Sequence, residues 1–314
     1  MKVSLLIKTI GFYVVTMCVF LGSCTKGKTD YQAERGSVVE EQVEFKEVAN
    51  IVSSGYTVRI EALNGALYRG YNDIRVRVEN TQTNTPVEVS NVTFLPIKTV
   101  ATGEKSSCPH QYNFSFKSAD KYFSGYTVFT DESGTEGTWT LYINFTIGTQ
   151  TFSVVKDVLV RQQTNRNLNM TMFTGKDDEQ YVIALISPQK PGVAENKLVA
   201  GIYKLNRPLE SSPINFSDQS QFSYSKVENY TLKLDPRMPE PSMGNHSSPN
   251  NKDLVQAADG LYHGVVNYTM TGNWTLNFIL LGPDGKVIRG TEVPKDFTPG
   301  VEGLKSELHL DILF

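Results

Sequence analysis

Three side chains in the segment LDPRMPEPSMGNHSSP, residues 234–249, could together bind a metal. Met238 and Met243 each carry a thioether sulfur, and His246 carries an imidazole. Thioethers are soft, neutral ligands that favour Cu(I), whereas calcium and magnesium prefer oxygen ligands. The prolines and the glycine bend the chain, so we expect a loop in which the three side chains can face one point. The segment therefore predicts a Cu(I) site.

Two residues downstream are further candidate ligands. Met270 lies in TMTGNW, where Thr-Gly-Asn predicts a hairpin turn at the same end of the domain. His263, on the preceding predicted strand, is a possible secondary ligand. The chain has seven methionines, and three of the five that follow residue 24 lie in these two segments. The alternative is that the methionines fill gaps in an apolar core and His246 is an ordinary surface residue.

Cys108 and His110, in the segment SSCPH, form a second possible ligand pair. A thiol and an imidazole two residues apart could supply half of a metal site, but two ligands are too few for a closed one. The alternative is that Cys108 is a small buried side chain with no ligand role. We treat this pair as a possible secondary site.

The N-terminal residues MKVSLLIKTIGFYVVTMCVFLGSC predict a bacterial lipoprotein signal. A basic start, an apolar run and Leu-Gly-Ser precede Cys24. The alternative is a transmembrane helix, which needs about 20 apolar residues, and this run is shorter. We therefore expect cleavage after residue 23 and lipidation at Cys24. The protein would then be anchored by lipid in the cell envelope, in the outer membrane, on either of its faces.

Charge and motif content argue against two classes of function. Without the two lysines of the signal, 28 basic residues face 33 acidic ones, a net charge of about −5, so we expect no nucleic-acid partner. The sequence has no G-x-S-x-G, phosphate-loop, H-E-x-x-H or paired-carboxylate signature, so we expect no enzymatic activity. Cys108 would be the one free cysteine of the mature chain, which precludes an internal disulfide.

The elements that must position these residues are β-strands. Aromatic and β-branched residues alternate with polar ones in five segments, and turn residues separate them. Helical periodicity is nearly absent, so the pattern predicts an all-β fold. The five segments are residues 56–63, 73–79, 139–147, 151–160 and 274–281.

The strands belong to two similar blocks. Residues 94–109 align with residues 234–249 without a gap, which places Pro96 on Pro236, and the only two tryptophans, Trp139 and Trp274, also coincide. Chance similarity between alternating strands is the alternative, but an ungapped loop favours two copies of one β-domain. The predicted organisation is a signal at 1–23, a polar tether at 24–45, a first β-sandwich at 46–161, a connector at 162–179 and a second β-sandwich at 180–314.

The second copy resembles a known family. A Pro/Met-rich loop ending in His, then GLYHGVV, then a Met and a GNWTL strand are similar to the YtkA-like domains, whose relatives include FixH-type proteins. The resemblance covers roughly residues 180–290. It implies a small Ig-like or cupredoxin-like β-sandwich and a role in copper handling in bacterial envelopes.

The first copy departs from this pattern. Lys98, Gly103 and Ser106 stand where the second copy has its loop ligands, and Asp131 stands in the place of Met270. We therefore expect the first copy to be mainly a spacer or a partner surface. Two functions follow from the sequence. One is Cu(I) buffering, or delivery to an envelope copper protein; the other is a tethered Ig-like module that binds a protein or glycan partner without metal.

Overall fold

The computed structural model describes residues 44–135, 137–207 and 219–314. The predicted signal, the lipidation site Cys24 and nearly all of the predicted tether lie outside the described residues. Residues 44–314 belong to one compact unit. None of the helical segments within the described ranges has the length and apolarity of a membrane-crossing helix.

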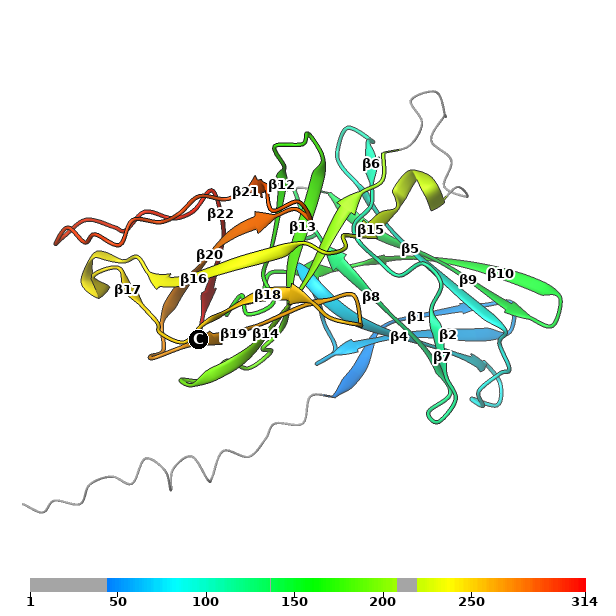
Figure 1. Ribbon diagram of the computed structural model, residues 1–314. Helices are drawn as coiled ribbons and strands as arrows, with labels where there is room; N and C mark the ends of the chain where they lie inside the picture. The colour runs from blue at the N-terminus through cyan, green and yellow to red at the C-terminus, as the bar shows by residue number, and fades with distance from the viewer. Residues whose placement is uncertain (1–43, 136, 208–218) are drawn as a thin grey trace, which may run out of the picture. The chain divides into compact units, whose positions relative to one another are not determined.

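The fold is all-β, as the alternation predicts (Figure 1). Two groups of strands can be distinguished by their pairing. The first strand set consists of β1 (Phe45–Ser53), β2 (Tyr56–Leu63), β3 (Leu67–Tyr68), β4 (Gly70–Asn80), β5 (Asn91–Thr99), β6 (Lys105–Ser106), β7 (Ser115–Lys117), β8 (Tyr122–Phe129), β9 (Thr138–Ile147), β10 (Gln150–Val158) and β11 (Val160–Arg161).

The second strand set follows a short connection. It consists of β12 (Met170–Thr174), β13 (Gln180–Ser187), β14 (Glu195–Leu205), β15 (Tyr224–Lys226), β16 (Thr231–Met238), β17 (His246–Ser247), β18 (Lys252–Gln256), β19 (Tyr262–Asn267), β20 (Asn273–Leu281), β21 (Val287–Arg289) and β22 (Leu308–Leu313).

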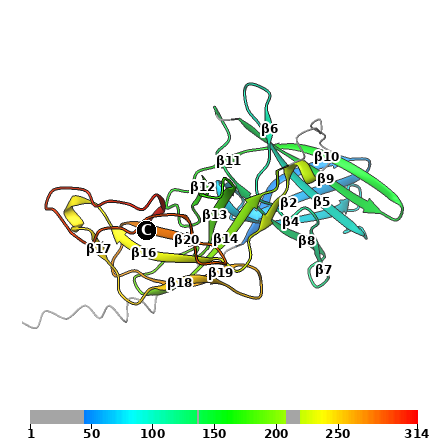
Figure 2. The ribbon, with the colours of Figure 1, turned by 45° about the horizontal axis from the view of Figure 1, so that its top comes forward.

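The two sets have the same strand order. The first has one sheet of order β1-β2-β4-β8-β7 and another of order β10-β9-β5-β6. In the second, β12-β13-β14-β19-β18 repeats the first order, and β16 lies between β17 and β20, which in turn pairs with β22. One difference is that β18 also pairs with β16, so the second set is a single continuous sheet (Figures 1 and 2).

The strand register is also the same in both sets. Pro96 of β5 lies opposite Leu141 of β9, and Pro236 of β16 lies opposite Leu276 of β20. These four residues occupy equivalent places in the sequence alignment of the two blocks. Corresponding side chains therefore occupy corresponding positions on the two backbones.

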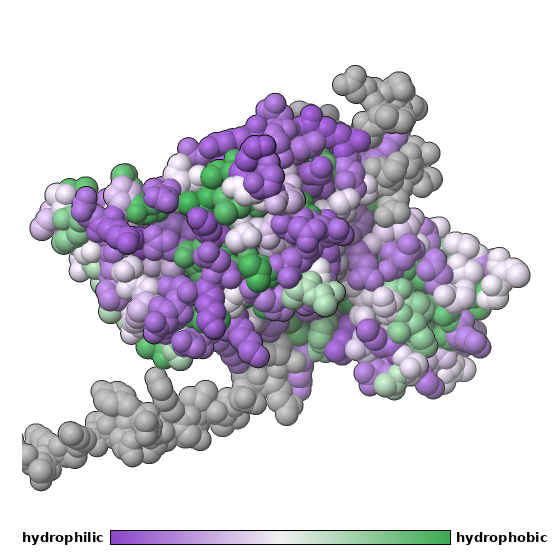
Figure 3. Space-filling view, viewed as in Figure 1, coloured by the Kyte–Doolittle hydropathy of each residue, from purple (hydrophilic) through white to green (hydrophobic). Residues whose placement is uncertain are grey.

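Each set has its own apolar core. Alternate side chains of the paired strands point inward, and the cores centre on Trp139 in the first set and Trp274 in the second, both fully buried. A smaller cluster, which includes Val128, Met170 and Tyr203, joins residues of both sets. On the face shown in Figure 3, hydrophobic residues form small separate areas among hydrophilic ones.

Two local predictions were wrong. The predicted connector contains a strand, β12, whose five residues pair with β13. The proline-rich segment is also less irregular than predicted, because Leu234–Met238 continues β16. Pro236 has a partner in β20 but none in β17 or β18, and a proline is tolerated in a strand where the missing N–H has no ladder bond to make.

Candidate metal centre

The hairpin of β16 and β17 holds two of the three predicted loop ligands. Met238 ends β16, His246 begins β17, and the two are direct partners in the antiparallel pairing (Figure 1). Directly opposite residues project to the same face of a sheet, with Cβ atoms about 5 Å apart. Met238 and His246 therefore lie side by side.

The tip of this hairpin brings the third predicted ligand back to the core. A short 3-10 helix, η3 (Pro241–Met243), fills the tip, and the Met243 N–H donates to the Glu240 carbonyl at 2.9 Å. Gly244 has a φ of 63°, a left-handed conformation that suits glycine and ends the turn. The half-buried Met243 packs on the core cluster that contains Met238.

The Trp274 indole lies beside the hairpin of β16 and β17 and contacts the segment that carries Met270. The ring of His246 lies 6.1 Å from the indole at 61°, an edge-to-face arrangement. His246 Nε2 is 2.9 Å from Thr269 Oγ1, and Trp274 Nε1 donates to the Met270 carbonyl oxygen at 3.0 Å. The histidine and the segment carrying Met270 thus meet at the same indole.

Met270 reaches the same core by a different connection from the one predicted. Its half-buried side chain packs on the cluster that holds Met238 and Trp274. The expected hairpin at Thr-Gly-Asn is wrong, because β19 pairs with β14 and β18 whereas β20 pairs with β16, β21 and β22. The segment instead crosses between strands that are not neighbours.

The first strand set holds an ion pair at the equivalent positions. Lys98 is the cross-strand partner of Ser106, as Met238 is of His246. Lys98 Nζ lies 2.7 Å from a carboxylate oxygen of Asp131, the residue that aligns with Met270. The side chains of Lys98 and Asp131 are therefore in contact in the first set. The second set repeats the strand pairing around these positions.

Two polar atoms near the candidate ligands have no partner among the described residues. Glu240 Oε2, in the hairpin tip, is buried without a hydrogen bond. The Tyr268 hydroxyl is also buried without one, and its ring lies 5.4 Å from that of Trp274. Burial raises the pKa of Tyr268. Sequence reasoning missed both residues, because nothing in their local sequence marks them.

His263 lies elsewhere. Val255 of β18 pairs with both His263 and Thr231, so His263 is level with the start of β16, whereas Met238 is its last residue. Seven residues of strand separate the two levels by about 23 Å. The exposed His263 Nε2 instead bonds a carboxylate oxygen of Asp259 at 2.9 Å. The structure does not bring His263 to the other candidate ligands.

Cys108 and His110 lie inside the first strand set. Cys108 is fully buried, with Sγ 3.3 Å from Thr127 Oγ1, and burial raises its pKa to about 12. His110 Nδ1 lies 2.7 Å from the Cys108 carbonyl oxygen, and burial lowers its pKa to about 4. The His110 Nε2 is buried without a hydrogen-bond partner in the described chain. At neutral pH the thiol is therefore protonated and the imidazole neutral.

The candidate ligands suit a soft monovalent cation by residue type. Thioethers and an imidazole bind a metal as uncharged ligands, and thioethers select Cu(I). His246 Nδ1 forms no hydrogen bond with a described residue. A cation held by neutral ligands in an apolar setting needs a compensating charge, and the unpartnered Glu240 carboxylate oxygen lies in the same hairpin. These residues fit Cu(I) better than a hard divalent cation.

Comparison with known proteins assigns no family. No protein family matches the chain, and no curated protein sequence matches it. A solved DUF4785 family protein from Legionella pneumophila has 11% identity and a TM-score of 0.24, over 74% of this chain and 55% of that one. A conserved domain protein from Bacillus anthracis has 13% identity and a TM-score of 0.23, over 86% and 90%. The chain thus spans about half the length of the Legionella protein.

Proposed function

We propose that this chain is a lipid-anchored envelope protein that binds one Cu(I) ion for copper buffering or delivery. Met238, Met243 and His246 are the proposed ligands, with Met270 as a fourth. The observation that carries the proposal is the cross-strand pairing of Met238 with His246 beside the Trp274 indole. The resemblance of the second copy to YtkA-like domains supports the same function.

The burial of the ligands bears on how the ion would be held. Met238 is only 2% exposed, so its sulfur is shielded from water and from oxidants. Met243, His246 and Met270 are half-buried, which leaves a route by which copper can enter or be passed to a partner. A protein that buffers or delivers a metal needs such partial access, whereas a purely structural centre is normally closed.

A competitive Cu(I) titration against a chromophoric chelator tests the proposal on the full chain. The variant Met238→Leu/Met243→Leu/His246→Gln/Met270→Leu removes the soft ligands while conserving most of the core volume. We expect one Cu(I) per parent chain and at least a 100-fold loss of affinity in the variant. The matched control, Met170→Leu/Met172→Leu, changes the two other described methionines and should bind like the parent.

Unchanged affinity in the four-fold variant would refute this site. Near-ultraviolet circular dichroism of both variants shows whether the Trp274 environment is kept, so that a loss of binding is not mistaken for misfolding. If neither the parent nor the variant binds Cu(I), the second candidate function gains support. That candidate is a binding module without metal, and a polar pocket elsewhere in the fold favours it.

A further inference from the structure

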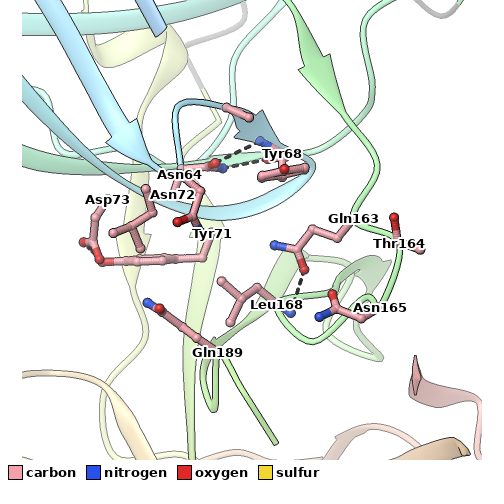
Figure 4. A pocket seen from close by; sticks show the side chains of 12 residues that line it. Asn64, Tyr68, Tyr71, Asn72, Asp73, Gln163, Thr164, Asn165, Leu168 and Gln189 are labelled. Carbon is pink, nitrogen blue, oxygen red and sulfur yellow. Dashed lines mark hydrogen bonds between the residues drawn. The ribbon is translucent and has the colours of Figure 1, made fainter. Parts of the chain in front are cut away.

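A pocket of about 330 Å³ lies where three separate segments meet, and it shares no lining residue with the candidate metal centre. Its walls come from residues 63–73 of the first strand set, from residues 163–168 of the connection to β12, and from Gln189 after β13 (Figure 4). Pockets of this size hold small organic ligands. The question is which chemistry its side chains recognise.

Aromatic side chains form part of the wall. Tyr68 and Tyr71 both line the pocket. Tyr71 is held in place because Tyr126 stacks on it at 5.6 Å and 16°, and because its hydroxyl donates to Asp73 Oδ1 at 3.0 Å. A fixed aromatic ring is a rigid apolar platform with a polar edge, and it binds at low cost in conformational entropy.

Side-chain amides supply most of the polar groups. Asn64 and Gln189 are exposed, and their amides form no hydrogen bond with any described residue. Gln163 accepts a bond from the Leu168 N–H at 3.1 Å through Oε1, which leaves its NH₂ group for a ligand (Figure 4). Each amide offers a donor and an acceptor within one rigid plane.

The pocket carries little charge. Among the described residues that line it, Asp73 is the one with an ionisable carboxyl, and none is a lysine, arginine or histidine. One oxygen of Asp73 already accepts the Tyr71 hydroxyl, and burial raises the pKa of this carboxyl. Phosphate and carboxylate ligands are normally held by cations, so an anionic ligand does not fit this wall.

The backbone next to the pocket is closed to an added peptide strand. Asn72 accepts the Tyr68 N–H at 2.9 Å through Oδ1 and donates to the Tyr68 carbonyl oxygen at 2.6 Å (Figure 4). Peptide recognition by strand addition requires these groups to be unpaired. Strand addition at Tyr68 is therefore blocked, which leaves the side chains as the main groups that the pocket offers.

We propose that this pocket binds one or two rings of a neutral saccharide. Sugar hydroxyls both donate and accept hydrogen bonds, which matches the amides of Asn64, Gln163 and Gln189. The apolar C–H faces of a sugar ring match the tyrosine rings. The inference stands independently of the copper proposal, because the two sites share no residue.

Saturation-transfer difference NMR on the full chain tests this inference with maltose, cellobiose, lactose and N,N′-diacetylchitobiose. Galacturonic acid disaccharide serves as the charged comparison, and a chelator in every sample removes any contribution of copper. We expect millimolar binding of at least one neutral disaccharide and at least ten-fold weaker binding of the charged one. No signal from any of the four neutral sugars would overturn the proposal.

The variant Asn64→Gly/Gln189→Ala removes two exposed amides, and glycine suits the positive φ of 58° at residue 64. It should weaken binding of the neutral sugar at least ten-fold. The matched control Asn84→Gly/Gln150→Ala changes an exposed Asn of similar φ, 53°, and an exposed Gln elsewhere, and should bind like the parent. Equal binding by both variants would place the sugar at another site and refute the assignment.

Discussion

The hairpin of β5 and β6 and the hairpin of β16 and β17 occupy equivalent places in the two strand sets but differ in chemistry. In the first, Lys98 reaches across to Asp131 and forms an ion pair. In the second, the same two positions hold Met238 and Met270, two thioethers on one apolar core. The comparison teaches that equivalent positions on repeated strands can carry a salt bridge in one region and a candidate copper site in the other.

Smaller features repeat in the same way. Trp139 Nε1 donates to the carbonyl oxygen of Asp131, as Trp274 Nε1 does to that of Met270, both at 3.0 Å. Gly137 and Gly272 each lie two residues before a tryptophan, and their φ angles are 133° and 132°. The tryptophan hydrogen bond and the glycine conformation are thus the same in both regions. Side chains can therefore be exchanged between equivalent positions of the two strand sets.

The largest expected effect is the transfer of binding to the first strand set. Lys98→Met/Ser106→His/Asp131→Met copies Met238, His246 and Met270 onto equivalent positions, and replacing a partly buried ion pair by apolar groups is often neutral for stability. We expect the Cu(I) stoichiometry to rise from one to two per chain in the chelator titration. Lys98→Leu/Ser106→Ala/Asp131→Leu is the control without ligand atoms. A stoichiometry of one in both would show that these three ligands at the equivalent positions are not sufficient for binding.

Acid should weaken the first strand set through His110. Because its folded pKa of about 4 lies below the ordinary value of 6.5, the unfolded chain binds a proton first as the pH falls. This stabilisation is complete above pH 6.5 and is lost as the pH falls towards 4, by about 1.4 kcal/mol per unit. Urea unfolding at pH 6.5 and pH 4.5 should therefore differ by about 2 kcal/mol from this group.

The His110→Asn variant isolates that contribution. It copies Asn250, the exposed residue at the aligned position of the second set. Other carboxyl groups titrate equally in the parent and the variant, so the comparison cancels them. The pH dependence should be shallower in His110→Asn, and an identical slope in both proteins would contradict the prediction.

Breaking the ion pair from one side should cost about 2 kcal/mol of unfolding free energy. Asp131→Asn leaves the Lys98 ammonium, whose side chain is 9% exposed, without its counter-charge. Asp131 is itself 38% exposed, so the loss is smaller than for a fully buried pair. Adding Lys98→Met should restore most of the stability, and additive effects in this double-mutant cycle would show that the two groups are not coupled.

The smallest expected effect distinguishes the two glycines. Gly137→Ala and Gly272→Ala meet the same positive-φ strain, so their difference reports contacts alone. A Cβ at residue 137 would lie 2.7 Å from the backbone oxygen of Thr99, whereas at residue 272 it would lie 2.8 Å from the terminal methyl of the Met238 side chain. Thermal unfolding should show Gly137→Ala to be about 1 kcal/mol more destabilising. Equal losses would mean that the methyl of Met238 is held as firmly as the backbone.

Much of the fold was predictable from local pattern. The alternation in residues 56–63 and 274–281 marked strands that the structure contains, since period-two patterning reports the two faces of a sheet. Pro236 misled the reading of its segment, because a proline without a neighbour to bond is compatible with a strand and sequence does not show the neighbours. The hairpin predicted before Trp274 was also wrong, because the sequence does not show which strands are neighbours.

The candidate sites were predictable only in part. Residue type pointed to Met238, Met243 and His246, and the pairing of Met238 with His246 follows from a hairpin whose partners are close in sequence. Glu240 and Tyr268 were not predictable, because whether a polar atom is left unpaired depends on packing from distant segments. The amide pocket was not predictable from the sequence, because two of its lining residues, Asn64 and Gln189, are more than a hundred residues apart.

The pairing of β18 with both β16 and β19 leaves the second strand set without a gap in its sheet. The corresponding strand of the first set, β7, is three residues long and pairs with β8 alone among the described strands. An open strand edge is where the backbone of another molecule can add, and Phe116 on β7 is 54% exposed. The shortness of β7 limits such growth, whereas the equivalent edge of the second set, β18, is already occupied by β16.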